Sequence, residues 1–313
     1  MAAFDSIDPN DDIAWSALRE HWQLRADTTY LNHGSFGPPP RAVREAQAVW
    51  RARLDEQPMD FFVRQYEPAY FAARARLAEF VGASESNLVL AEDATFAMNH
   101  VAASFPLTAN DEVLLTDHEY GAVLRIWERA CQRAGAAPPK IATLPRPLRT
   151  VSETVEAIVN QLTPRTKLLI VSHITSATAV TLPVKEICAA LQSRGVAVCI
   201  DGPHAIAQLE LKLDELGCDY YCASCHKWLC GPFGSGFLYV APQRQATTTP
   251  AVLSWGRVQG DDRHTWQDEF VWSGTRDPSN WLALPTAIDF LTQIGLPAFR
   301  ARTHALARYA RQQ

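Results

Sequence analysis

Val196-Ala-Val-Cys-Ile-Asp201 and, further on, Ser224-Cys-His-Lys-Trp-Leu-Cys-Gly-Pro-Phe-Gly-Ser-Gly236 are the two stretches that decide the fold of this chain. Residues 196–200 form an unbroken apolar run, which is typical of a strand buried on both faces of a parallel sheet. Asp201 then stands at the carboxyl end of that strand, where such sheets bind ligands. Because a buried carboxylate is costly without a partner, we expect a cationic group to meet Asp201.

Lys227 suggests which ligand supplies that group. A lysine among apolar and aromatic neighbours can lose its proton and attack a carbonyl, and a buried aspartate can keep a pyridinium nitrogen protonated. Asp201 and Lys227 together predict a site for pyridoxal 5'-phosphate (PLP). The alternative is that Asp201 caps a turn and Lys227 is a solvated surface residue. The nearby His204 and His226, with a glycine-rich turn after the lysine, favour the cofactor site.

Composition sets wider limits. The chain has 313 residues, of which 47% are apolar and 20% charged, and its net charge is -5. These values are ordinary for a soluble globular protein with a large core, and no basic patch interleaved with aromatics predicts nucleic-acid binding. The N-terminus is acidic and lacks a signal-peptide pattern, and no apolar stretch reaches membrane length. We therefore expect a cytoplasmic protein.

The cysteines do not predict a metal site. There are seven of them, mostly inside apolar runs, which suits reduced core residues. Cys222-Ala-Ser-Cys-His226 matches the spelling of c-type haem attachment, and Cys218 and Cys230 are close enough to suggest zinc. Haem attachment requires export, and residues 218–224 have the composition of a buried strand rather than of a zinc turn. We expect neither haem nor metal.

Strand and helix patterns alternate along most of the chain. Strands are expected near 87–91 and at 112–116, 140–144, 167–173, 196–200, 218–224 and 236–242. Helices are expected from about 94 and at 120–134, 151–162, 184–193, 281–294 and 297–311, with a loop at 243–264. This alternation predicts an α/β fold with a mostly parallel sheet, right-handed crossovers and helices on both faces.

Polar residues follow several of the expected strands, at 117–120, 172–176 and 201–204. The carboxyl ends of parallel strands share one rim of the sheet, so these segments converge where a cofactor would bind. Ala94 and Thr95 open an expected helix, whose free N–H groups and threonine hydroxyl could hold a phosphate. The competing interpretation is that Thr95 is only a helix cap.

An N-terminal segment, Thr29-Tyr-Leu-Asn-His-Gly-Ser-Phe-Gly37, is predicted to be a short strand running into a glycine-rich turn. Asn32, His33 and Ser35 are polar groups on that turn and could face a substrate. A polar turn that supports only itself is an equal alternative.

Four motifs together resemble the class V aminotransferase family of fold-type I PLP enzymes. They are Tyr30-Leu-Asn-His-Gly-Ser35, Asp201-x-x-His204, Ser224-x-His-Lys-Trp-Leu-x-Gly-Pro232 and Ser273-Gly-Thr-Arg-Asp277. Within that family the chain looks most similar to the isopenicillin N epimerase-like proteins, with cysteine desulfurases as more distant relatives. The resemblance runs from about Tyr30 to the C-terminus.

The resemblance implies a role for each matching residue. Lys227 would form the internal aldimine with PLP and later move the substrate's alpha proton. Asp201 would pair with the pyridine nitrogen, and His204 would reach the ring's phenolic oxygen. The phosphate would be held by Ala94, Thr95, Ser224 and His226.

Further implied contacts concern the ring and a second subunit. Tyr120 would stack on the ring, with His118 as the competitor for that role. Ser176 falls where desulfurases carry an asparagine beside the ring, and Thr175 would share its role. Thr275 would reach the phosphate site of a partner subunit, which implies a homodimer with shared active sites.

The same resemblance divides the chain into three parts. Residues 1–27 would form an N-terminal arm, 28–245 the large PLP-binding domain, and 246–313 a linker, the dimer-contact motif and the start of a C-terminal domain. Family members continue beyond the position of Gln313, so we expect this small domain to be truncated here.

The implied activity is that of a PLP-dependent enzyme acting on an amino acid through an external aldimine and alpha-proton abstraction. Epimerase-like or carbon–sulfur lyase chemistry is favoured. Cysteine desulfurase and aminotransferase are the alternatives among enzymes. The non-enzymatic alternative is a truncated PLP-binding or inactive homologue.

Overall fold

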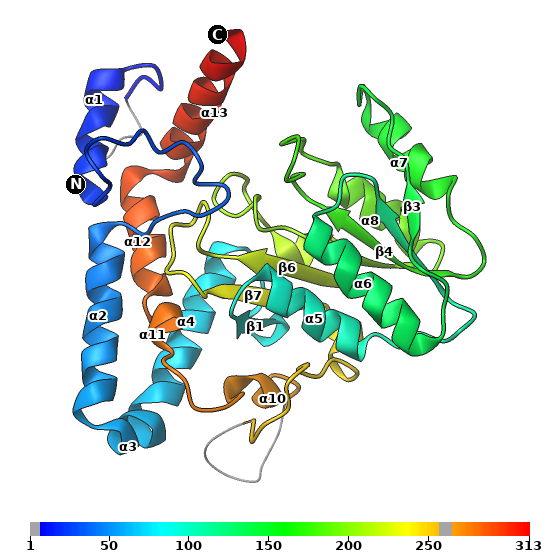
Figure 1. The fold of residues 1–313 in the computed structure, drawn as a ribbon, viewed down its shortest axis with the longest axis horizontal. Coiled ribbons are helices and arrows are strands. Elements are labelled where there is room, and N and C mark those ends of the chain that lie inside the picture. Colours follow the sequence, from blue (N-terminus) through cyan, green and yellow to red (C-terminus); the bar gives the residue numbers. More distant parts are fainter. Residues whose placement is uncertain (1–6, 257–264) are drawn as a thin grey trace.

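The computed structural model describes residues 7–256 and 265–313. Its centre is a seven-stranded sheet in the order β1-β7-β6-β5-β4-β2-β3 (Figure 1). The strands are β1 (Leu88–Ala91), β2 (Glu112–Thr116), β3 (Lys140–Ala142), β4 (Thr166–Ser172), β5 (Ala197–Asp201), β6 (Tyr220–Ser224) and β7 (Gly236–Val240). The pairs from β3 across to β6 are parallel, and β7 is antiparallel to β6 and to β1. The predicted α/β fold with a mostly parallel sheet is confirmed.

Both faces of the sheet are buried, which explains why its strands lack polar alternation. In β5, Val198 and Ile200 belong to one apolar cluster, whereas Ala197 and Cys199 belong to the other. Successive side chains of a strand point to opposite faces, so a strand covered on both sides must be apolar throughout. The run at 196–200 has that composition for this reason.

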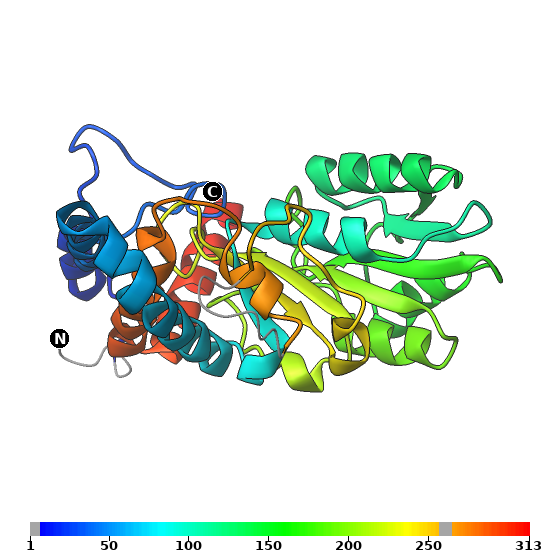
Figure 2. The ribbon, with the colours of Figure 1, turned by 90° about the horizontal axis from the view of Figure 1, so that it is seen from below.

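Helices cover the two faces and one edge of the sheet (Figures 1 and 2). Trp127 of α6 and Met98 of α5 pack on the Cys199 side, while Ile187 of α8 and Leu77 of α4 pack on the Ile200 side. The helices are α1 (Asp12–Ser16), α2 (Arg41–Glu56), α3 (Pro58–Asp60), α4 (Tyr66–Phe80), α5 (Ala94–Ser104), α6 (Gly121–Ala134), α7 (Val151–Val159), α8 (Val184–Gln192), α9 (Pro242–Gln245), α10 (Asp268–Val271), α11 (Ser279–Leu282), α12 (Leu284–Ile294) and α13 (Leu296–Gln312).

Two local predictions were wrong in part. The glycine-rich turn expected within residues 29–37 is present, since the N–H groups of Ser35 and Phe36 both donate to the carbonyl of Asn32, but the short strand before it is not formed and pairs with no strand of the described chain. The helix expected at 281–294 is two helices, because Pro285 lies in the first turn of α12 and cannot donate the N–H bond of a continuous helix.

The loop expected at 243–264 begins with the short helix α9, and its last part lies outside the described residues. Over the part of the chain that the structure describes, no single helix has the length and apolar composition needed to cross a bilayer. One helix pair bent by 78°, Ser279–Ile294 with Leu296–Gln312, meets those two criteria when taken together.

Candidate active site

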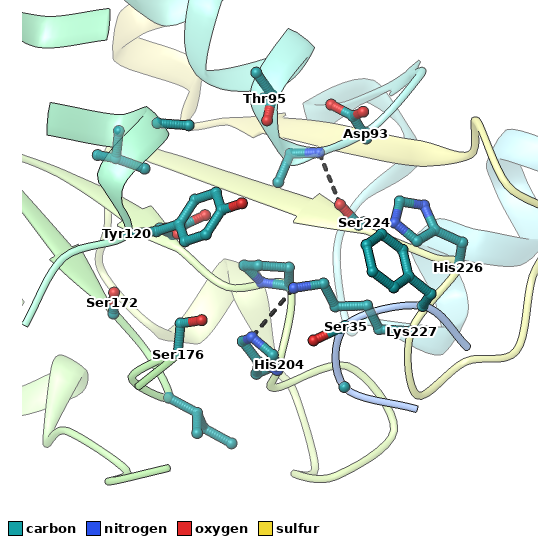
Figure 3. A pocket seen from close by; sticks show the side chains of 18 of the residues that line it. Ser35, Asp93, Thr95, Tyr120, Ser172, Ser176, His204, Ser224, His226 and Lys227 are labelled. Carbon is teal, nitrogen blue, oxygen red and sulfur yellow. Dashed lines mark hydrogen bonds between the residues drawn. The ribbon is translucent and has the colours of Figure 1, made fainter. Parts of the chain in front are cut away.

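A cavity of about 260 Å³ opens at the carboxyl ends of β4, β5 and β6, beside the first turns of α5 and α6 (Figure 3). Parallel α/β sheets bind ligands at this rim. The structure brings together around it ten of the residues proposed from the sequence: Ser35, Ala94, Thr95, Tyr120, Ser176, Asp201, His204, Ser224, His226 and Lys227.

Asp201 ends β5 at the base of the cavity with only 6% of its surface exposed. Within the described residues no hydrogen bond reaches its carboxylate, although its carbonyl accepts the N–H of His173. Burial raises the pKa of this carboxyl to about 7, and the positive charge of Lys227 opposes that shift. A buried, unpaired carboxyl facing a cavity is suited to a cationic ligand group.

Lys227 follows β6, and its Nζ lies 3.1 Å from Nε2 of His204. Burial lowers the pKa of Lys227, an effect that the charges of Asp201 and Asp93 oppose. Burial, followed by the charge of Lys227, lowers the pKa of His204 to about 4. The imidazole is therefore neutral near pH 7 and leaves the lysine free to lose its proton.

The first turn of α5 forms a cradle for an anion. The N–H of Ala94 donates to Oγ of Ser224 at 3.0 Å, and the N-cap Asp93 accepts the N–H of Phe96. For the N–H of Thr95 no partner is found among the described residues. Nδ1 of His226 is likewise buried with no hydrogen-bond partner among them. A helix N-terminus with unpaired donors nearby favours a phosphate.

Tyr120 and Ser176 approach from the other side of the cavity (Figure 3). Tyr120 is the N-cap of α6, and the residue is 54% exposed, so its ring is available to stack on a flat ligand. His118, the competing candidate, does not line the cavity. Its Nδ1 lies 3.3 Å from the hydroxyl of Thr178.

Four of the proposed residues lie outside the lining of this cavity. Thr175 is buried, and its hydroxyl bonds to the hydroxyl of Thr178 and accepts the N–H of Val180. Asn32 closes the turn before Ser35 with its carbonyl. His33 stacks on Trp228 at a centroid distance of 6.4 Å. Thr275 is exposed and does not line the cavity.

The turn at 32–37 is held against the lysine segment. The N–H of Gly37 donates to the carbonyl of His226 at 2.9 Å. A Cβ at position 37 would lie 2.2 Å from the carbonyl oxygen of Lys227, a distance that no side chain tolerates. Glycine is needed here because the two backbones touch. This contact brings Ser35 into the cavity and supports the chain around Lys227.

Reasoning from the sequence missed several residues of the site. Gly34, Phe36, Asp93 and Ser172 also line the cavity. Glu119 lies half-buried behind it and bonds to Ser172. Because Glu119 directly precedes the proposed site residue Tyr120, the sequence could have suggested that it lies near the site. Nothing in the neighbouring sequence indicates that its side chain points inward.

These residues fit PLP. Asp201 and Lys227 face one cavity, and no salt bridge joins them in the described part of the chain. The orphaned Nδ1 of His226 and the opening of α5 lie at the edge where a phosphate would be held. An acid for the ring nitrogen, an amine for the aldehyde and donors for the phosphate are therefore all present.

Comparison with known proteins agrees with the geometry. The profile described as Aminotransferase class-V matches residues 58–313. The chain is 38% identical over 312 residues to isopenicillin N epimerase of Amycolatopsis lactamdurans, which covers 96% of this chain and 78% of that relative.

Two solved structures of C-DES, a cystine C–S lyase, have the same fold at 25% identity. A variant with glycine covalently linked to the PLP cofactor gives a TM-score of 0.78 and covers 86% of this chain and 72% of that one. The complex with the product cysteine persulfide gives 0.76 and covers 86% and 73%. The chain therefore belongs to the class V aminotransferase family of fold-type I enzymes and uses PLP as its cofactor.

Proposed function

We propose that the protein is an amino-acid epimerase, which removes the proton from the alpha carbon of its substrate and returns a proton to the opposite face. The observation that carries this proposal is the placement of Lys227 on one side of the cavity and of the hydroxyl side chains Tyr120 and Ser176 on the other (Figure 3). The similarity to isopenicillin N epimerase over 96% of the chain supports it.

The cofactor's contribution is electronic. PLP, when bound, supplies an electron-withdrawing ring that makes the alpha proton of a linked amino acid acidic. Asp201 would hold a proton on the ring nitrogen, because the desolvated carboxylate gains most from a cation beside it. Ser224, His226 and the first turn of α5 would hold the phosphate.

Lys227 is the base in this proposal. Burial lowers its pKa, so a larger fraction of the amine is neutral near pH 7 than for an exposed lysine. His204, 3.1 Å away, keeps the amine at the inner end of the cavity. Lys227 takes the alpha proton on Nζ, and the bond to the alpha carbon leaves its electron pair with the substrate.

The second proton comes from the other wall of the cavity. The hydroxyl of Tyr120 or of Ser176 would donate it to the alpha carbon and regain a proton from water through the open mouth. Lys227 would release the proton that it took to the same water. No group is oxidised or reduced, and the net result is inversion at the alpha carbon. A lysine paired with a hydroxyl donor on the opposite wall meets the geometric need for two acid–base groups.

Carbon–sulfur lyase activity is the second candidate, and the C-DES structures favour it. Lys227 would again take the alpha proton. The bond between the beta carbon and sulfur would then break, and the sulfur would leave with the electron pair and take up a proton. Desulfurase chemistry gains no support from the described cysteines, since all seven are buried and none lines the cavity.

The test is to incubate the PLP-loaded protein in D2O with isopenicillin N, L-cysteine or cystine. Epimerisation predicts that the alpha-proton signal in the NMR spectrum is lost while the opposite stereoisomer appears. Lyase activity predicts release of sulfide or persulfide with pyruvate. Inversion of no substrate tested, together with sulfur release, would replace the first candidate by the second. Lys227→Ala is the control for both reactions.

A further inference from the structure

Glu119 ties the end of β2 to the end of β4 behind the cavity. Its Oε1 accepts hydrogen bonds from the hydroxyl of Thr116 at 2.6 Å and from the N–H of Ser172 at 3.1 Å. Its Oε2 lies 2.7 Å from the hydroxyl oxygen of Ser172. These three bonds connect two neighbouring strands of the sheet through one side chain.

Both ends of this connection touch residues of the site. Tyr120 follows Glu119 directly and is the N-cap of α6. Ser172 lines the cavity and lies opposite Asp201 in the register of β4 and β5. Glu119 therefore holds in place both the backbone that carries Tyr120 and the β4 residue Ser172, which lies next to Asp201.

The charge of Asp201 is the neighbouring charge that acts on Glu119. The titratable groups on the neighbouring elements are Asp117 and His118 on its own turn, His173 after β4, Asp201 on β5 and, beyond it, Lys227. In the described residues no cation forms a hydrogen bond to Glu119. Burial raises the pKa of Glu119 to about 7, its bonds to Thr116 and Ser172 oppose the shift, and the charge of Asp201 adds to it.

We propose that Glu119 is a positioning residue that keeps its proton: its neutral carboxyl group fixes the Tyr120 turn to β4 and adds no second negative charge beside Asp201 when the cofactor binds. The proposal rests on the roles proposed above for Tyr120 and Asp201. With the proton on Oε2, this O–H donates to Oγ of Ser172, and Oε1 keeps its two donors. An ionised Glu119 would instead place a second buried negative charge beside Asp201.

Glutamine is the matching substitution, because its amide oxygen and N–H reproduce the acceptor and donor of a protonated carboxyl. We expect Glu119→Gln to bind PLP within about threefold of the wild-type affinity, and Glu119→Ala to bind it at least about tenfold more weakly. PLP affinity is measured by titrating the PLP-free protein. Activity is measured separately, as kcat and KM.

Glu112 provides the control at the other end of β2. Its Oε1 accepts the hydroxyl of Thr166 at 2.6 Å, so it makes the same kind of β2–β4 bond far from the cavity. Glu112→Gln and Glu112→Ala should leave the PLP affinity unchanged. Equal weakening by Glu112→Ala and Glu119→Ala would show that Glu119 acts only through the stability of the sheet, which would overturn the proposal.

The proton itself is detected by infrared spectroscopy of the PLP-free protein. Near pH 6, Glu119→Gln should remove one carbonyl band of a protonated carboxyl, and Asp201→Asn should remove another. The proposal is wrong if Glu119→Gln removes no band, or if it weakens PLP binding as much as Glu119→Ala.

The PLP titration and the infrared measurement do not depend on catalytic activity. Failure of the epimerisation assay with normal behaviour of Glu119→Gln would reject the reaction and leave the inference standing. If Glu119→Ala does not fold, the glutamine variant and the infrared band still decide the question.

Discussion

The protonation state of the Asp201 carboxyl affects both PLP binding and the stability of the PLP-free protein. Its carboxyl has a pKa of about 7 against an ordinary value of 3.8. Between these two values the unfolded chain has released the proton while the folded chain still holds it. Stability that is present at low pH is therefore lost as pH rises through this window.

We expect the free energy of unfolding of the PLP-free protein to fall by up to about 4 kcal/mol between pH 4 and 7 on account of Asp201. Asp201→Asn should show a correspondingly smaller decline, because the amide does not titrate. Urea denaturation at several pH values measures this difference. Equal slopes in the two proteins would mean that Asp201 ionises normally in the fold.

Asp201→Asn should also impair the chemistry. An amide cannot hold a proton on the ring nitrogen, so exchange of the substrate's alpha proton with D2O should slow by about 10²-fold or more. NMR of the alpha-proton signal gives the rate. A rate close to that of the wild type would remove the electronic role of Asp201.

Lys227→Ala should lose the covalent link to PLP. After borohydride reduction, the wild-type mass should rise by one PLP and the mass of the variant should not change, because no other described amine lines the cavity. Lys185→Ala, an exposed change on α8, is the control and should gain the cofactor. A PLP adduct on the Lys227→Ala variant would assign the link to another residue.

The turn at 32–37 supports the site as a whole element, because its backbone contacts the segment that carries Lys227. In Gly37→Ala the new methyl group would overlap the carbonyl of Lys227, so the turn must move away. We expect a loss of about 1 to 3 kcal/mol in the free energy of unfolding and weaker PLP binding. Thermal denaturation and PLP titration measure the two effects.

Gly121→Ala is the matched control for that experiment. Gly121 begins α6 next to Tyr120, and a Cβ there would meet nothing within 4 Å. Alanine is the better helix former by up to about 1 kcal/mol, so this variant should be neutral or slightly more stable. If both glycine variants behave alike, the backbone contact at Gly37 is not what supports the lysine segment.

The proposal that the protein forms a homodimer rests on Thr275. It lies exposed and away from the cavity of its own chain, as a residue that completes a partner's phosphate site would. We expect a homodimer by sedimentation, and about tenfold weaker PLP binding in Thr275→Ala. A monomer with full PLP affinity would contradict the shared site.

Local patterns predicted most of the fold. The strands at 112–116 and near 196–201, and the helices that begin at 121, 151 and 184, are where apolar periodicity indicated them. Periodicity depends only on neighbouring residues, so it can be recognised without the fold. It failed for the short strand expected before the turn at 32–37, where the backbone bonds to itself and to the carbonyl of His226, a residue far along the chain.

For the site, the chemical identity of the residues could be predicted but their direction could not. Asp201, His204 and Lys227 follow from residue type and from their place at strand ends, because a parallel sheet gathers those ends at one rim. Whether Thr175 faces the cavity or its own loop, and whether Glu119 points to solvent or to Ser172, depends on which strand lies alongside. Those orientations arise from contacts between segments distant in sequence, so only the folded chain settles them.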